Sequence, residues 1–115
     1  MTLRSFDGKR PNAAKDAFVD ESAIVIGDVT LHERSSVWPG AVVRADDDSV
    51  VIGKGSAILD LALVEAPRGR PVTVGDGCVI SHGARLHGCE NMMLGDQVDG
   101  CMIFKHLNVR MMLDR

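Results

Sequence analysis

The hydrophobic positions of the chain recur every six residues, which is neither the period of an α-helix nor that of an alternating strand. Between residues 13 and 91 an aliphatic residue opens nearly every six-residue unit, and the fifth residue of most units is small or β-branched. Two short insertions, at 49–51 and 70–73, shift this register without ending it. After Ala13 the opening residues are Val19, Val25, Leu31, Val37, Val43, Ile52, Ile58, Val64, Val74, Ile80 and Leu86.

This pattern is typical of a left-handed parallel β-helix, in which three short strands form one triangular coil of about 18 residues. The opening aliphatic residues point inward and stack in columns, and the small fifth residues fit the tight corners. Successive coils pair as parallel strands at a spacing of about 4.8 Å. We therefore predict an all-β solenoid, a left-handed parallel β-helix of about four to five coils.

The period also divides the chain. Residues 1–12 carry no repeat and are predicted to form a lead-in strand or loop, and residues 13–100 form the β-helix domain. In the tail, 101–115, apolar residues at 103, 104, 107 and 111 favour a short C-terminal helix that covers the open end of the solenoid. An irregular tail, or one exchanged between copies, is the alternative.

Composition narrows the possible functions. The chain has 115 residues, of which only 3% are aromatic, as expected for a narrow interior without room for large rings. A net charge of −3 with scattered Lys and Arg gives no basic face, so binding to nucleic acid is not expected. No apolar run approaches the roughly 20 residues that span a bilayer, and the first residues lack the apolar core of a signal peptide. We expect a cytoplasmic protein without a membrane partner.

Two of the four histidines, His82 and His87, lie five residues apart in the segment 80–89. Three six-residue units make one coil. Residues that hold the same position within units three apart, here called the same slot, therefore lie side by side on adjacent coils. This register predicts that Glu65 neighbours His87, and that Asp60 neighbours His82. His82 and His87 themselves fall on different faces of the prism.

A shared site for the two histidines therefore needs a second copy of the chain. In a cyclic homotrimer, Glu65 and His87 of one copy can meet His82 of the next, and a prism this small has little core of its own. Two imidazoles and a carboxylate suit Zn²⁺ or Fe²⁺, and Asp60 is placed to orient His82. Alternatively, the histidines are polar interface residues without a metal, and Glu65 simply forms an ion pair with Arg44.

Over residues 18–89 the chain resembles the γ-class carbonic anhydrases and their ferripyochelin-binding-protein-like relatives. The resemblance rests on several segments with ordered spacing, namely Ile26-Gly-Asp-Val-Thr, Ser36-Val-Trp-Pro-Gly-Ala-Val-Val-Arg-Ala-Asp, Ile58-Leu-Asp and the segment from His82 to Cys89. It implies a left-handed β-helix, a homotrimer, a Zn²⁺ or Fe²⁺ ion at each subunit interface, and reversible hydration of carbon dioxide to bicarbonate.

The resemblance also implies roles for individual residues. His82 and His87 match two of the three metal-binding histidines, Arg44 and Asp46 match an interface arginine and acid, and Asp60 matches the acid of a Gln-Asp pair. The third histidine is replaced by Glu65, which we expect to be the third metal ligand. The glutamine is replaced by Leu59, so weak or altered activity is expected. A non-catalytic assembly protein is the alternative function, and a hexapeptide-repeat acyltransferase is a third that the histidine pattern disfavours.

Overall fold

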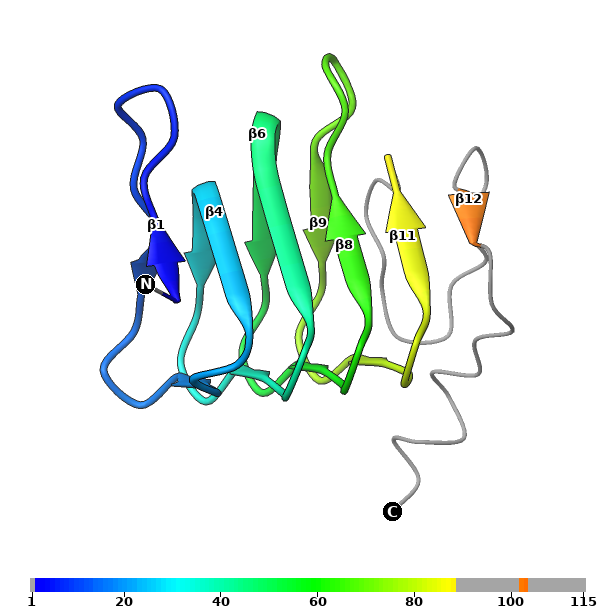
Figure 1. Ribbon diagram of the computed structural model, residues 1–115. Coiled ribbons are helices and arrows are strands. Elements are labelled where there is room, and N and C mark those ends of the chain that lie inside the picture. The colour runs from blue at the N-terminus through cyan, green and yellow to red at the C-terminus, as the bar shows by residue number, and fades with distance from the viewer. Residues whose placement is uncertain (1, 89–101, 104–115) are drawn as a thin grey trace.

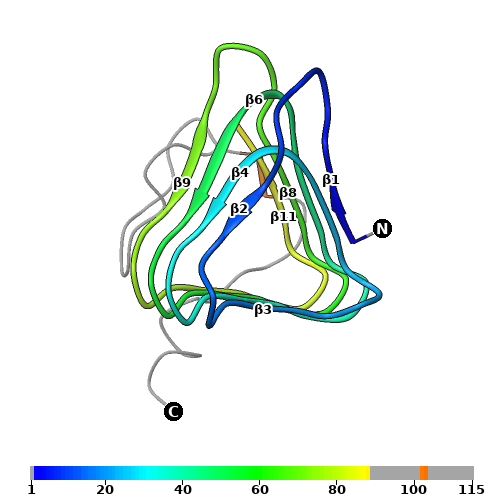
Figure 2. The same cartoon turned by 90° about the vertical axis from the view of Figure 1, so that its left-hand side faces the viewer.

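The computed structural model describes residues 2–88 and 102–103. Over this range the chain winds as a left-handed parallel β-helix with a triangular cross-section (Figure 1, Figure 2). The coils stack side by side in Figure 1, and Figure 2 looks along the stack. The predicted fold class is confirmed.

Each face of the prism is a parallel sheet with one strand or half-strand from each coil. The first, here called the β11 face, holds β1 (Leu3–Arg4), the first halves of β4 (Ile24–Leu31) and β6 (Val42–Ile52), β8 (Leu63–Glu65) and β11 (Arg85–His87). The β9 face holds β2 (Asn12–Ala13), the second halves of β4 and β6, and β9 (Val72–Val74). The β10 face holds β3 (Phe18–Val19), β5 (Ser36–Val37), β7 (Ala57–Ile58) and β10 (Val79–Ile80).

The strand register follows the six-residue units through both insertions. On the β11 face, Val25 pairs with Val43, Val43 with Val64, and Val64 with Leu86. The lead-in segment also contributes, because Leu3 of β1 pairs with Val25. Slots three units apart therefore lie side by side, as the period predicts.

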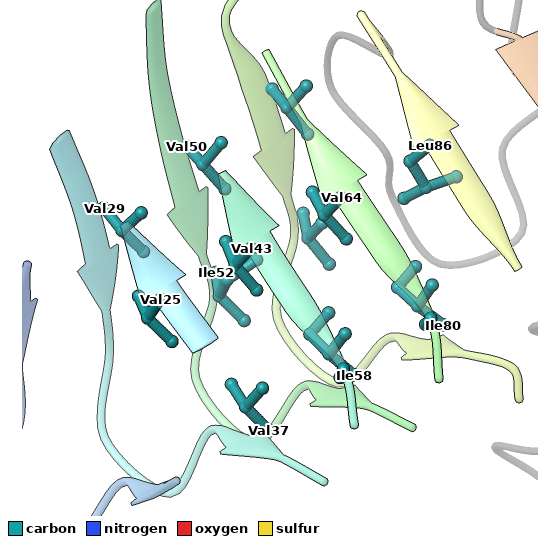
Figure 3. Packing of buried hydrophobic residues seen from close by; sticks show 14 of the residues in the cluster. Val25, Val29, Val37, Val43, Val50, Ile52, Ile58, Val64, Ile80 and Leu86 are labelled. Atoms are coloured by element: carbon teal, nitrogen blue, oxygen red, sulfur yellow. The ribbon is translucent and has the colours of Figure 1, made fainter. Parts of the chain in front are cut away.

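The opening aliphatic residues form the core (Figure 3). The side chains of Val43, Val64 and Leu86 are completely buried, and those from the other two faces converge on them. The aromatic side chains of the described residues, Phe6, Phe18 and Trp38, are exposed instead, and the rings of Phe18 and Trp38 lie 5.0 Å apart between centroids with a tilt of 47°. The interior is thus filled by aliphatic side chains that match its width.

The structure places the extra residues of the two insertions between Ala45 and Val50 and between Glu65 and Val72, and not at 49–51 and 70–73, because Val50 and Val51 pair with Val72 and Thr73. The Asp48 carboxylate accepts hydrogen bonds from the backbone N–H groups of Ser49 (2.8 Å) and Gly69 (2.9 Å). The register of β4 against β6 shifts after Gly27, which has a φ of +83° and approaches the backbone of Ala45 so closely that a Cβ atom would overlap it. The extra residues therefore leave the paired strands on either side in register.

Most of the C-terminal tail lies outside the described residues. Met102 and Ile103 form β12, which pairs antiparallel with β11 (Leu86 with Ile103, and His87 with Met102). The helix predicted for 101–115 therefore does not include these two residues, because their backbone pairs with a strand. Within the described ranges, no helix has the length and apolar character needed to cross a membrane.

Candidate functional site

Four charged or titratable side chains form a continuous chain of contacts along the outer side of the β11 face. Arg44, Glu65 and His87 occupy the same slot on three adjacent strands, because Arg44 pairs with Glu65 and Glu65 with His87. Asp46 lies two residues after Arg44 and so projects from the same side of the strand. The six-residue register brings Arg44, Glu65 and His87 together, and the local spacing of two residues adds Asp46.

Glu65 is the centre of this chain. Its Oε1 atom lies 2.7 Å from Nδ1 of His87, within hydrogen-bonding distance, and its Oε2 atom lies 3.5 Å from a guanidinium nitrogen of Arg44. The side chains are partly buried, with 24% of Glu65 and 34% of His87 exposed. Both carboxylate oxygens therefore already have partners within one copy of the chain.

Arg44 also donates a hydrogen bond of 2.8 Å to the Asp46 carboxylate. This hydrogen bond lowers the pKa of Asp46 below its ordinary value and raises the pKa of Arg44, although partial burial opposes both shifts. Asp46 therefore stays ionised well into acid, and Arg44 is held between two carboxylates.

His82 lies in the corner between β10 and β11 and not within a face, because residues 82 and 83 form the turn. Its Nε2 atom is 3.8 Å from Oδ1 of Asp60, which is too long for a hydrogen bond. The His82 side chain is 63% exposed and that of Asp60 44%. Asp60 is thus adjacent to His82, as the register predicts, at a distance that allows only a weak electrostatic contact.

One copy of the chain brings Glu65 to His87 and Asp60 to His82, but it does not unite the two pairs. Among the described residues, no group of three or more His, Cys, Asp and Glu side chains is arranged to hold a metal ion. Leu59, which precedes Asp60, is only 8% exposed and offers no hydrogen-bonding atom from its side chain.

The structure also shows an apolar surface that the sequence analysis did not identify. Outward-facing Ile24, Val42 and Leu63 pair in succession on the β11 face, and Ile26 lies beside Arg44. All four are partly exposed, and together they are called the outer aliphatic stripe. The sequence did contain a sign of this surface, because adjacent apolar residues such as Ile24-Val25-Ile26 and Val42-Val43 make both sides of a strand apolar. A strand with both sides apolar is usually covered on both sides.

Several of the proteins that are similar to this chain in sequence are carbonic anhydrases. A probable carbonic anhydrase from Methanocaldococcus jannaschii is 40% identical over 85 residues, which cover 71% of this chain and 54% of that protein. The mitochondrial gamma carbonic anhydrase 1 of Arabidopsis thaliana is 38% identical over 117 residues, which cover 91% of this chain and 42% of that protein. The chain therefore spans about half the length of the curated relatives it matches. No protein-family model matches it.

Among solved structures, a hexapeptide transferase family protein from Anaplasma phagocytophilum superposes with a TM-score of 0.73 at 31% sequence identity. The match covers 81% of this chain and 52% of that one. The fold and the sequence thus point to the same group of proteins.

Proposed function

The chain belongs to the γ-carbonic-anhydrase-like group of hexapeptide-repeat proteins, and on that premise we propose that it is a homotrimer with a metal ion at each subunit interface. We further propose that this site acts on carbon dioxide and bicarbonate with weak or altered activity. The observation that carries the proposal is the contact between Glu65 and His87 on the β11 face, with His82 exposed at the adjoining corner.

The outer aliphatic stripe supports assembly through the β11 face. Partly exposed aliphatic side chains in register on a sheet gain free energy when a second surface covers them. The stripe runs beside Arg44, Glu65 and His87, so a copy that docks there also covers the candidate site. His82 projects from the corner next to this face and is accessible to a neighbouring copy.

The available donors fit a divalent metal such as Zn²⁺ or Fe²⁺. His87 and Glu65 come from one copy and His82 from the next, which gives two imidazoles with a carboxylate close by. A divalent metal in such a site supplies the Lewis acidity that makes a water molecule acidic near neutral pH. Arg44, held by Asp46, keeps positive charge beside Glu65, and Asp60 lies near the His82 ring.

Two residues are expected to lower the activity. Glu65 adds negative charge next to His87, which weakens the acidifying effect of a metal there. Leu59 is a buried hydrocarbon at the position where the resemblance implies a glutamine, so its side chain cannot orient a reacting water. Both effects reduce the rate without affecting the fold.

A direct test is to load the full chain with Zn²⁺, or with Fe²⁺ without oxygen, and to measure its molar mass and metal content. We expect about 37 kDa, three times the chain mass of 12.4 kDa, with about one metal ion per chain. Carbon dioxide hydration should be slow but metal-dependent, and His87→Ala should abolish it. A monomer, or less than about 0.1 metal ion per chain after loading, would contradict the proposal.

A non-catalytic assembly protein is the second candidate function, and the burial of Leu59 favours it. In that case a trimer forms, but metal loading gives no hydration of carbon dioxide. An acyltransferase, the third candidate, predicts binding of an acyl-coenzyme A, which a titration of the trimer would detect. The cytoplasmic location expected from the sequence stays a prediction.

A further inference from the structure

Glu65 has two partners within its own chain, and this limits how it can serve a metal. Oε1 lies 2.7 Å from Nδ1 of His87, and Oε2 faces the guanidinium of Arg44 at 3.5 Å. Strand pairing holds the three residues side by side, since Arg44 pairs with Glu65 and Glu65 with His87. The contact with His87 is thus part of the β-helix and exists before any second copy docks.

The distance to His87 is that of a hydrogen bond and not that of two ligands of one ion. Two donor atoms bound tetrahedrally to Zn²⁺ at about 2.0–2.1 Å lie roughly 3.3 Å apart. An approach of 2.7 Å instead matches an N–H group donating to a carboxylate. To bind the metal directly, Glu65 would have to leave His87 and weaken its contact with Arg44.

Building on the proposed metal site, we propose that Glu65 is a positioning residue and not a metal ligand. It accepts a hydrogen bond from Nδ1–H of His87, which fixes the ring tautomer and leaves the lone pair on Nε2 for the metal. The protein then supplies two nitrogen ligands, one from His87 and one from His82 of the next copy, and solvent completes the coordination.

Arg44 and Asp46 extend this arrangement. Arg44 contacts Oε2 of Glu65 and so favours the orientation in which Oε1 faces His87, while Asp46 holds Arg44 at 2.8 Å. The sequence led us to expect Glu65 as the third ligand because its carboxylate replaces a histidine. The geometry changes this assignment, since the Glu65 oxygen nearest His87 already lies within hydrogen-bonding distance of Nδ1 of His87.

The tautomer of His87 tests the proposal without any metal. Two-dimensional ¹H–¹⁵N spectra of the imidazole rings in the full-length wild-type protein, at a pH where His87 is neutral, should show His87 protonated on Nδ1. Glu65→Gln should keep this tautomer because its amide oxygen still accepts the hydrogen bond, whereas Glu65→Ala should lose it. Protonation of wild-type His87 on Nε2 would overturn the proposal.

The ligand set tests it in the metal-loaded protein. X-ray absorption of wild type and of Glu65→Ala loaded with Zn²⁺ should give the same two imidazole ligands, with an affinity about 10–100-fold weaker in Glu65→Ala. Glu65→Gln should largely restore the affinity. Glu65→His should add a third imidazole and raise the affinity above that of the wild type.

The outcomes separate this inference from the function on which it rests. If Zn²⁺ binds the wild type through a carboxylate that Glu65→Ala removes, Glu65 is a ligand and only this inference falls. If the wild type binds no metal, both the proposed function and the role of Glu65 toward the metal are wrong. If all Glu65 variants bind as the wild type does, Glu65 has no role toward the metal and the inference is wrong.

Discussion

Arg44 contacts the carboxylates of Asp46 and Glu65. Its hydrogen bond to Asp46 makes the stability of the fold depend on pH in the acid range. The pKa of Asp46 is lowered in the folded protein, chiefly by the hydrogen bond from Arg44, so the unfolded chain binds a proton on this group more readily. The stabilisation is therefore complete above the unfolded pKa of about 3.9 and is lost as the pH falls through the lower folded value.

We expect Asp46→Asn to lower the free energy of unfolding at pH 7 by at most about 1 kcal/mol, because Arg44 is 43% exposed and solvent screens the pair. The difference from wild type should shrink below about pH 4 and vanish once Asp46 is protonated in the folded state. Urea unfolding at pH 7 and pH 3 measures both values. A difference that grows toward acid would contradict this account of the ion pair.

Among the strands and corners, the buried hydroxyl of Ser56 links successive coils. Ser35 and Ser56 occupy the same small-residue slot one coil apart, and both are almost fully buried. The hydroxyl of Ser56 donates to the carbonyl of Gly75 and accepts from the backbone N–H of Cys78 at 3.0 Å. Within the described part of the chain, the hydroxyl of Ser35 has no hydrogen-bond partner.

This difference predicts opposite outcomes for the same substitution. Ser56→Ala leaves the buried N–H of Cys78 and the partly buried carbonyl of Gly75 without their partner, and should cost about 1–3 kcal/mol of unfolding free energy. Ser35→Ala removes an unsatisfied hydroxyl and should be neutral or slightly stabilising. Chemical denaturation of the two variants side by side provides the comparison, and equal losses would contradict the assigned hydrogen bonds.

The strands show how far the sequence determines the fold. The opening aliphatic residues identified the β-helix and placed Glu65 beside His87, because strand register depends only on counting residues between columns. The ion pair between Glu65 and Arg44 that the sequence offered as an alternative is present, at 3.5 Å. Which oxygen of Glu65 faces Arg44 and which faces His87 could not be predicted, since this depends on side-chain rotamers. The position of His82 in a corner was also missed. The turns recur at the third and fourth residues of the units, as at 60–61 and 82–83, but the period of the aliphatic residues alone does not show where within a unit the chain bends.

At the scale of the whole molecule, assembly decides whether a metal site exists, since the two histidines do not meet within one chain. The outer aliphatic stripe provides the test. Val42→Asp places a charge in the stripe. If the proposed trimer forms through the β11 face, this variant should be a monomer, because the carboxylate would lose its hydration in the interface. Thr73→Asp is the matched control on the β9 face, which carries none of the candidate site residues, and should leave the trimer intact.

Light scattering of the two variants gives the molar mass directly. Dissociation by Thr73→Asp but not by Val42→Asp would move the interface away from the β11 face and from His87. Circular dichroism should show the β-structure in both variants, so that loss of assembly is distinguished from loss of folding.

If His82 of one copy and His87 of another complete the same metal site, two variants that each lack one of these histidines should complement each other when they are mixed. Neither His82→Ala nor His87→Ala alone should bind metal above background. When the two are unfolded together at equal concentration and refolded, random assembly should restore about a quarter of the interface sites, each with His87 from one variant and His82 from the other. Measured zinc of about 0.25 per chain is the predicted result. Zinc at background in mixed trimers of confirmed mass would contradict the account.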